Sequence, residues 1–248
     1  MIHLFSDFGL EGPYIGQVKA VLGHLAPHVL VVDLLSDAPV CDPRAAAYML
    51  AAYDSGCRAA DVIMAVVDPG VGSERAAVVI RADDRWYVGP DNGIFEAVMR
   101  QAGDDVMCWE ILWRPTVLSA SFHGRDIFAP IAAQIATGLN PDQDTDGRFR
   151  TVERGKMSRD KWPDDLDEVI YIDRFGNLIT GLRGITCNLA KGLIVGDVVV
   201  QRHHTFADVA RGDAFCYENS NGLIEIAVNL GRADTILNMS IGDKVAVK

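Results

Sequence analysis

The chain has 248 residues, of which 49% are hydrophobic and 23% charged, which is typical of a globular protein with a buried core and excludes a disordered chain. Its formal net charge of −11 at pH 7 disfavours binding to nucleic acid or to an anionic membrane, because phosphate groups repel an acidic surface. The longest apolar stretches, 29–35 and 62–67, are too short to span a bilayer.

The first residues predict a strand and not a signal peptide. Residues 1–7 (MIHLFSD) lack a basic segment and pass directly into an apolar run. The five cysteines are odd in number, widely spaced and without a C-x-x-C pair. We therefore expect reduced, mostly buried thiols in a cytoplasmic protein, and no metal site built on them. They are Cys41, Cys57, Cys108, Cys187 and Cys216.

Helices and strands are expected to alternate along the first half of the chain. Apolar residues at helical spacing predict a helix after Pro13, and residues 29–35 (VLVVDLL) predict a buried strand. Asp42 followed by Pro43 is typical of a helix start, and the Ala-rich residues 44–53 continue that helix. Further elements are predicted as strands at 62–67, 76–80 and 86–88, a turn at 89–93, and a helix at 126–137.

This alternation predicts an α/β fold, with an N-terminal layered domain built on a largely parallel sheet. Such sheets bind ligands at the carboxyl ends of their strands. Asp7 and Asp68 each follow an apolar strand directly, so their positions favour a functional role.

The composition changes at about residue 139, where a polar, weakly periodic segment begins. We expect an N-terminal domain over 1–150, a linker over 151–164 and a second domain over 165–248. The second domain contains short strand-like pieces separated by turns, which predict a small all-β, barrel-like domain. These pieces are 168–172, 178–180, 193–200, 223–228 and 244–247.

Several familiar motifs fail when their context is considered. The Gly70-x-Gly72 pair follows a strand, but Arg75 replaces the third glycine of a dinucleotide fingerprint and a strand follows instead of a helix. The chain has no P-loop, and its Asp-Phe-Gly at 7–9 lacks the other kinase motifs. His203 and His204 have no third ligand at zinc spacing, so we predict no metal site.

Asp68, Arg75 and His123 are the side chains best suited to chemistry, although each also has an ordinary explanation. Asp68 and Arg75 lie on one Gly-rich loop and could form a loop-stabilising ion pair, while His123 precedes a predicted helix and could cap it. The polar turns at 173–177 and 218–222 could likewise be plain turn chemistry, or they could hold an amino acid and a base.

Seven segments follow one another along nearly the whole chain: SDFG (6–9), YIGQVKAVL (14–22), VVDPGVGSER (66–75), GPDNGIF (89–95), SFHGRDIFAPIAA (121–133), IDRFGNLITG (172–181) and NSNGLIEIAVN (219–229). Each segment alone is weakly specific. Taken in this order, they resemble the S-adenosyl-L-methionine (SAM) hydroxide adenosyltransferases, or SAM hydrolases, which are relatives of the bacterial fluorinating enzyme.

The resemblance implies an enzyme that cleaves SAM with water to adenosine and methionine, without a metal or organic cofactor. It implies a homotrimer whose sites lie between the N-terminal domain of one subunit and the C-terminal domain of its neighbour. Asp68, Arg75 and His123 match the family's catalytic trio around the attacking water, and Asp7 matches the carboxylate that holds the ribose diol. One position departs from the family: Gly12 stands where an acidic residue is usual, and Glu11 is adjacent.

The remaining carried-over residues lie in the second domain. Asp173 and Ser220 match groups that hold the methionine end of the substrate. Asn177, the backbone near Asn229, and Phe206 match contacts to adenine.

Three alternative functions stay open at this stage, one of which is an adenosine-binding hydrolase that acts on another 5′-thio-nucleoside. The other two differ more in chemistry. The first is a SAM-dependent halogenase, in which a serine helps to hold the halide; Gly124 occupies that position here and has no hydroxyl. The second is a non-catalytic module that binds SAM or adenosine, which would not require the trio of Asp68, Arg75 and His123.

Overall fold

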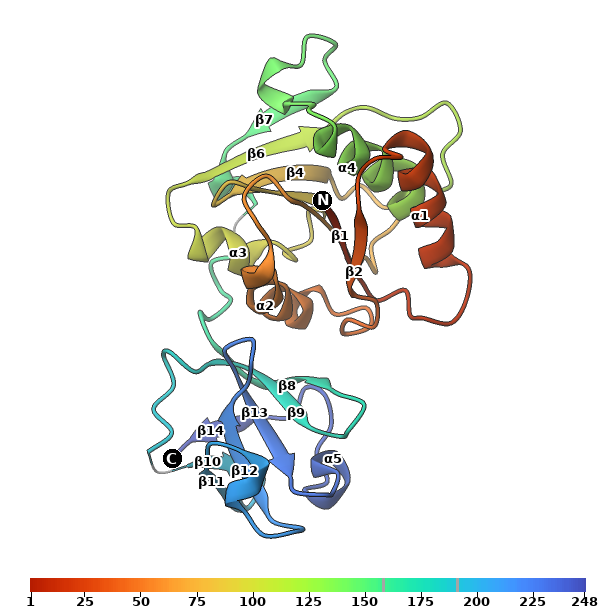
Figure 1. Ribbon diagram of the computed structural model, residues 1–248. Coiled ribbons are helices and arrows are strands. Elements are labelled where there is room, and N and C mark those ends of the chain that lie inside the picture. The colour runs from red at the N-terminus through yellow and green to blue at the C-terminus, as the bar shows by residue number, and fades with distance from the viewer. Residues whose placement is uncertain (158, 191) are drawn as a thin grey trace. The chain divides into compact units, whose positions relative to one another are not determined.

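The computed structural model describes residues 1–157, 159–190 and 192–248. The chain forms two compact units, Met1–Asp160 and Lys161–Lys248, each with its own sheet (Figure 1). No helix in the described ranges is long and apolar enough to cross a membrane.

The first unit is built on a seven-stranded sheet in the order β2-β1-β3-β5-β4-β6-β7. The α/β fold is confirmed, with parallel pairing in the half formed by β2, β1, β3 and β5 and antiparallel pairing in the other half. The strands are β1 (Ile2–Ser6), β2 (Val31–Leu35), β3 (Val62–Val66), β4 (Ala77–Ala82), β5 (Arg85–Pro90), β6 (Val106–Ile111) and β7 (Phe149–Val152).

Helices cover both faces of this sheet. In Figure 1, α1 (Tyr14–Leu25) and α4 (Ala129–Ala136) lie side by side on one face, and α2 (Pro43–Tyr53) and α3 (Glu96–Gln101) lie on the other. The predicted start of α2 is confirmed, because the Asp42 carboxylate accepts hydrogen bonds from the first backbone N–H groups of the helix. Short 3₁₀ turns occupy Asp54–Gly56, Pro141–Gln143 and Arg154–Lys156.

Three local predictions for this unit need correction. The strand predicted as buried, β2, is only half-buried, because it lies at the edge of the sheet with a neighbour on one side. The helix expected at 126–137 begins with a π-helical turn, η2 (Gly124–Phe128), before α4. The polar segment after residue 139 contains β7, which pairs with β6 and carries the first unit on to Asp160.

The second unit is a nearly closed barrel with strand order β14-β10-β11-β12-β13-β9-β8. Its two edge strands meet where the Val169 N–H donates to Asp243 O at 2.9 Å and the Gly242 N–H donates to Val169 O at 2.8 Å. The all-β prediction is confirmed. Its elements are β8 (Leu166–Ile172), β9 (Leu178–Arg183), β10 (Leu193–Val195), β11 (Val198–Arg202), η5 (Phe206–Asp208), β12 (Ala214–Glu218), β13 (Leu223–Val228), α5 (Ala233–Ile236) and β14 (Val245–Val247).

Two strands of the barrel differ from the prediction. The run 193–200 is a hairpin of β10 and β11, because Gly196 adopts a positive φ of 56° and turns the chain. Strand β12, which pairs with both β11 and β13, was not predicted from the sequence.

All five cysteines are free thiols. Cys108 and Cys216 are buried as expected, and burial raises the pKa of each to about 11. The expectation of mostly buried thiols fails for Cys41, which is exposed.

Candidate active site

Asp68 and Arg75 form a closely bonded pair on the loop that follows β3. The Arg75 Nε–H donates to both oxygens of the Asp68 carboxylate, at 3.1 and 3.0 Å, and Arg75 Nη2 also donates to Oδ2. The Arg75 side chain is only 10% exposed, and the Asp68 side chain only 5%. A buried carboxylate needs such pairing, and the forked guanidinium fixes its orientation as well as its charge.

His123 extends this pair into a chain of three side chains. Arg75 Nη2 lies 2.9 Å from His123 Nδ1. Because a guanidinium nitrogen can only donate, Nδ1 must be the acceptor, and the imidazole proton must therefore be on Nε2. Burial and the charge of Arg75 lower the pKa of His123 from 6.5, so the ring is neutral at pH 7. The ordinary explanation for His123 as a helix cap finds no support, because its side chain makes no cap hydrogen bond to η2.

Backbone geometry holds the loop that carries Arg75 against the loop that carries His123. Gly72 has a φ of 82°, and a Cβ there would lie 2.6 Å from the carbonyl oxygen of Ala120. Glycine is thus required on the first loop for both its conformation and its close approach to the second. The ion pair and His123 meet because these loops are in contact.

Two further side chains, not singled out from the sequence, hold the ends of these loops. The Asn92 side-chain amide donates to Val67 O at 2.8 Å, one residue before Asp68. The Asp126 carboxylate accepts from Ser119 N–H at 2.8 Å and closes the loop that carries His123. Both residues lie inside the segments that carry the family resemblance, and this was the only feature of the sequence that could have pointed to them.

Gly124 follows His123 and opens the π-helical turn, a conformation often found at functional sites. It is buried, and a Cβ at this position would lie 3.0 Å from Cζ of Phe8. A side chain here therefore requires Phe8 to move. The rings of Phe8, Tyr14 and Phe122 pack against one another beside it, with centroid distances of 5.4 to 6.0 Å.

Asp7 lies at the same edge of the sheet as Asp68, since each follows a parallel strand. Its carboxylate accepts a hydrogen bond from the Cys41 N–H at 3.0 Å. Burial raises the pKa of Asp7, the hydrogen bond from Cys41 opposes that shift, and the negative charge of Asp68 adds to it. The structure therefore brings Asp7 together with Asp68, Arg75 and His123 in the first unit.

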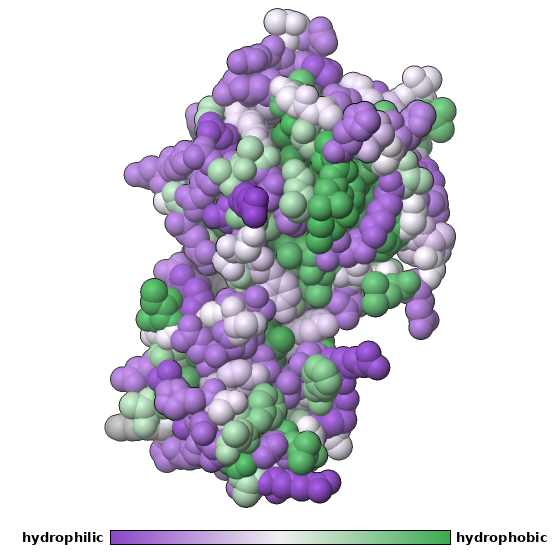
Figure 2. All heavy atoms as spheres, in the orientation of Figure 1, coloured by the Kyte–Doolittle hydropathy of each residue, from purple (hydrophilic) through white to green (hydrophobic). Residues whose placement is uncertain are grey.

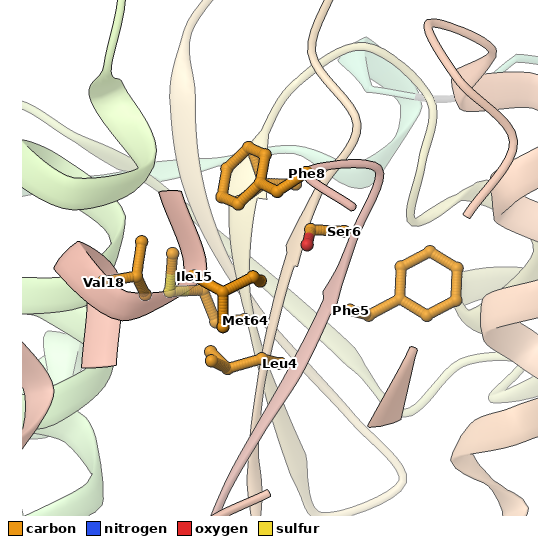
Figure 3. A pocket seen from close by; sticks show the side chains of 8 residues that line it. Leu4, Phe5, Ser6, Phe8, Ile15, Val18 and Met64 are labelled. Carbon is orange, nitrogen blue, oxygen red and sulfur yellow. The ribbon is translucent and has the colours of Figure 1, made fainter. Parts of the chain in front are cut away.

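A small apolar cavity lies below Phe8, between β1 and α1. Figure 3 shows Leu4, Ile15, Val18 and Met64 around it, while Phe5 points to the opposite side of β1. Its volume of about 10 Å³ admits no more than a water molecule, so it is not the binding site of a larger substrate.

Gly12, the position that departs from the family pattern, lies in an unusual backbone conformation. Gly12 has a φ of 103°, a conformation that an acidic side chain would adopt only with strain. The adjacent Glu11 is exposed.

In the second unit, Asp173 and Asn177 share one turn between β8 and β9. Asp173 Oδ1 accepts from the backbone N–H groups of Phe175 and Asn177, both at 2.8 Å, and Oδ2 accepts from the Asn177 side chain at 3.0 Å. Hydrogen bonds within the turn thus use much of the accepting capacity of the Asp173 carboxylate, as expected for a residue that stabilises a turn.

The other three candidates of this unit lie at separate points. Ser220 is exposed on the turn between β12 and β13. The Asn229 side chain donates to Val209 O at 2.8 Å. Phe206 is 36% exposed and meets the Phe215 ring edge-on, with centroids 4.9 Å apart.

Among the residues that the structure describes, no group of three or more His, Cys, Asp or Glu side chains is arranged to hold a metal ion.

Comparison with known proteins covers both units. The family description "SAM hydroxide adenosyltransferase N-terminal domain" matches residues 2–144, and "SAM hydroxide adenosyltransferase C-terminal domain" matches 167–246. Relatives named (R)-S-adenosyl-L-methionine hydrolase are 39% identical in Thermus thermophilus, over 97% of this chain and 96% of the relative, and 36% identical in Salinispora tropica, over 99% and 97%.

Two less similar proteins also match nearly the whole chain. A crystal structure of an uncharacterized conserved protein from Thermotoga maritima superposes with a TM-score of 0.83 and 30% identity, over 99% of this chain and 98% of that one. A fluorinase from Nocardia brasiliensis is 23% identical, over 100% of this chain and 96% of the relative. Two matching domain descriptions and near-complete relatives above 30% identity place the chain in the SAM hydroxide adenosyltransferase family.

Proposed function

We propose that this protein hydrolyses SAM to adenosine and L-methionine, with water attacking the ribose C5′. The observation that carries the proposal is the Asp68–Arg75–His123 chain, in which one buried carboxylate and one neutral imidazole are held by the same guanidinium. The relatives at 36% and 39% identity that are named for hydrolysis of the (R) form support the same reaction for this chain.

The substrate supplies a good leaving group, because its sulfur is a positively charged sulfonium. In the proposed step the water oxygen forms a bond to C5′ while the C5′–S bond breaks and its electron pair returns to sulfur. The protein has to place the water opposite sulfur and remove one proton, and such positioning can lower a barrier by about 7–11 kcal/mol. The step needs no metal and no organic cofactor.

We propose different roles for Asp68 and His123 toward the attacking water, and their hydrogen bonds support this division. His123 Nδ1 is occupied by Arg75, so the ring offers the Nε2–H as a donor and orients the water through its oxygen. Asp68 keeps lone pairs beyond those bonded to Arg75, and it is the member of the trio that can accept the proton. Arg75 stabilises the negative charge that develops during this transfer.

The binding roles follow the family resemblance. We propose that Asp7 accepts hydrogen bonds from the ribose hydroxyls, and that Asp173 and Ser220 hold the methionine end. Asn177, the backbone at Asn229, and Phe206 would contact adenine.

We also propose a homotrimer with shared sites. Figure 2 shows a green hydrophobic area on the first unit, between the positions of α1 and α2 in Figure 1. Leu10, Val40 and Val117 are large apolar residues of this unit with most of their surface exposed, which favours a covering partner. Light scattering is expected to give three times the 27.0 kDa mass of one chain.

Water is favoured over halide as the nucleophile by the environment of Gly124. A serine hydroxyl at this position would need Phe8 to move, and the fluorinase is the most weakly similar of the relatives compared above. Halide in the assay is therefore expected to give no halogenated nucleoside.

The function is tested by incubating purified protein with SAM in halide-free buffer and separating the products by chromatography. Equal amounts of adenosine and methionine support the hydrolase. SAM binding without turnover would instead support a non-catalytic module, and a halogenated nucleoside formed only with chloride or fluoride would support a halogenase.

A further inference from the structure

A buried carboxylate in the barrel has no place in the proposed chemistry. Glu225 lies on β13 and is 6% exposed. It accepts one hydrogen bond from the Tyr217 hydroxyl, Oε1 at 2.6 Å, and another from the Asn219 side-chain amide, Oε2 at 3.1 Å. Burying a carboxylate is costly, and two neutral donors satisfy it here. The free-energy cost of burying this carboxylate suggests that Glu225 has a role beyond packing.

One of these bonds orients the side chain that shapes the Ser220 turn. Asn219 Oδ1 accepts from the backbone N–H groups of Asn221 and Leu223, at 3.0 and 3.1 Å. The opposite end of the same amide, Nδ2, donates to Glu225. Because an amide must present its oxygen to the turn and its nitrogen to an acceptor, Glu225 selects the orientation in which Asn219 supports the turn.

The second bond leads to the aromatic residues on the neighbouring strand. Tyr217 stacks on Phe215 with centroids 5.4 Å apart and meets the edge of Phe206 at 5.9 Å. Burial and the neighbouring Glu225 raise the pKa of Tyr217, which keeps its hydroxyl protonated as a donor. A single carboxylate thus connects the Ser220 turn with the ring cluster that contains Phe206.

We propose that Glu225 is a positioning residue for SAM, holding the Ser220 turn through Asn219 and the Phe206 ring through Tyr217. This inference rests on the proposed function, because Ser220 and Phe206 are the contacts proposed for the two ends of the substrate. Glu225 itself touches neither end; its effect is to hold both contacts on one rigid part of the barrel.

Reversing the Glu225–Asn219 hydrogen bond tests the inference. Asn219→Asp keeps the Oδ1 acceptor for the turn but sets a second carboxylate against Glu225. This variant is expected to raise KM for SAM about tenfold and to change kcat by less than about twofold, because the contacts it disturbs hold the substrate and not the water. Adding Glu225→Gln supplies an amide donor to the carboxylate that Asn219→Asp introduces, and it keeps an oxygen acceptor for the Tyr217 hydroxyl. The double variant is expected to return KM to within about threefold of wild type.

The matched control is Asp197→Asn, which removes an exposed carboxylate from the turn between β10 and β11 of the same barrel. Its kinetics are expected to equal those of wild type. An unchanged KM in Asn219→Asp, or a double variant no better than the single one, would overturn the inference while leaving an active hydrolase. A wild-type protein that does not hydrolyse SAM would contradict the proposed function itself. Glu225→Leu is a second test of the inference, and it is expected to raise KM for SAM. Thermal unfolding of the same variant is measured to establish that it is folded.

Discussion

The two units hold their proposed site residues in different ways. In the first, Arg75 joins Asp68, on its own loop, to His123, which lies 48 residues further along the chain, and two of the three side chains are largely buried. In the second, Asp173 bonds to residues two and four positions away, and Ser220 is exposed on a hairpin turn. Non-local, buried contacts fix geometry before substrate arrives, as catalysis requires. Local turns present groups for recognition. Substitutions in the first unit's trio are therefore expected to lower kcat, and those in the second unit's turns to raise KM.

The largest effect is expected for Asp68→Asn. The amide keeps the shape of the carboxylate but cannot accept the proton, so kcat should fall about a thousandfold while KM changes little. Steady-state kinetics measure both values. Asp84→Asn, at a side chain that is 61% exposed, is the matched control and should behave as wild type. Wild-type turnover in Asp68→Asn would remove Asp68 from the chemistry.

Arg75→Lys is the next strongest test of the trio. A lysine keeps the charge but cannot donate in a fork to Asp68 and also reach His123, so kcat is expected to fall about a hundredfold. SAM binding, measured by calorimetry, should be retained. A variant with nearly full kcat would show that charge alone is sufficient and that the shared guanidinium has no catalytic role.

Asp7 sharpens the comparison, because it lies in the first unit but is assigned to binding. Asp7→Asn weakens the acceptors proposed for the ribose hydroxyls and should raise KM about thirtyfold with kcat nearly unchanged. Adenosine should lose affinity as an inhibitor by a similar factor. Loss of kcat at constant KM would assign Asp7 to the chemistry instead.

The pH dependence tests the neutral imidazole. The pKa of His123 is lowered below 6.5, so the ring is neutral above that pH and gains a proton only below it. Protonation puts a proton on Nδ1, opposite the N–H of Arg75, and breaks the chain. We expect kcat/KM to be constant above pH 6.5 and to fall about tenfold per unit below the lowered pKa. A fall in kcat/KM centred at or above pH 6.5 would contradict this assignment. If Asp7→Asn keeps the predicted fall at low pH, Asp7 is excluded as the titrating group.

Local signals in the sequence predicted the elements whose causes are local. The Asp42–Pro43 start of α2 needs only neighbouring residues, and the strands β1 and β3 follow from continuous apolar runs. The positive φ of Gly196, which divides β10 from β11, was not distinguishable from an ordinary strand glycine. The half-buried state of β2 depends on its place at the sheet edge, which periodicity does not report.

The candidate site also combines features that the local sequence predicts with features that depend on the folded chain. The positions of Asp7 and Asp68 after strands pointed to the sheet edge, but contact between Arg75 and His123 depends on two loops that meet only in the folded chain. Glu225 was not predicted, because a charged residue in a strand ordinarily predicts a solvent-facing position. Its two hydrogen-bond donors, on β12 and the adjoining turn, satisfy the buried carboxylate and are brought to it by the pairing of β12 with β13.

The sharing of sites between subunits can be tested by complementation. Asp68→Asn and Asp173→Ala chains, each impaired alone, are co-expressed in equal amounts. If each site combines the first unit of one subunit with the second unit of its neighbour, about a quarter of the sites recover both intact halves. Absence of recovered activity would place all site residues on one chain.

The central claim, attack of water on C5′, is tested most directly by hydrolysis of SAM in water labelled with oxygen-18. The proposed mechanism predicts one labelled oxygen in the adenosine 5′-hydroxyl, none in methionine, and loss of labelled product in Asp68→Asn. Adenosine without the label, or a product other than adenosine that carries it, would contradict the proposed mechanism.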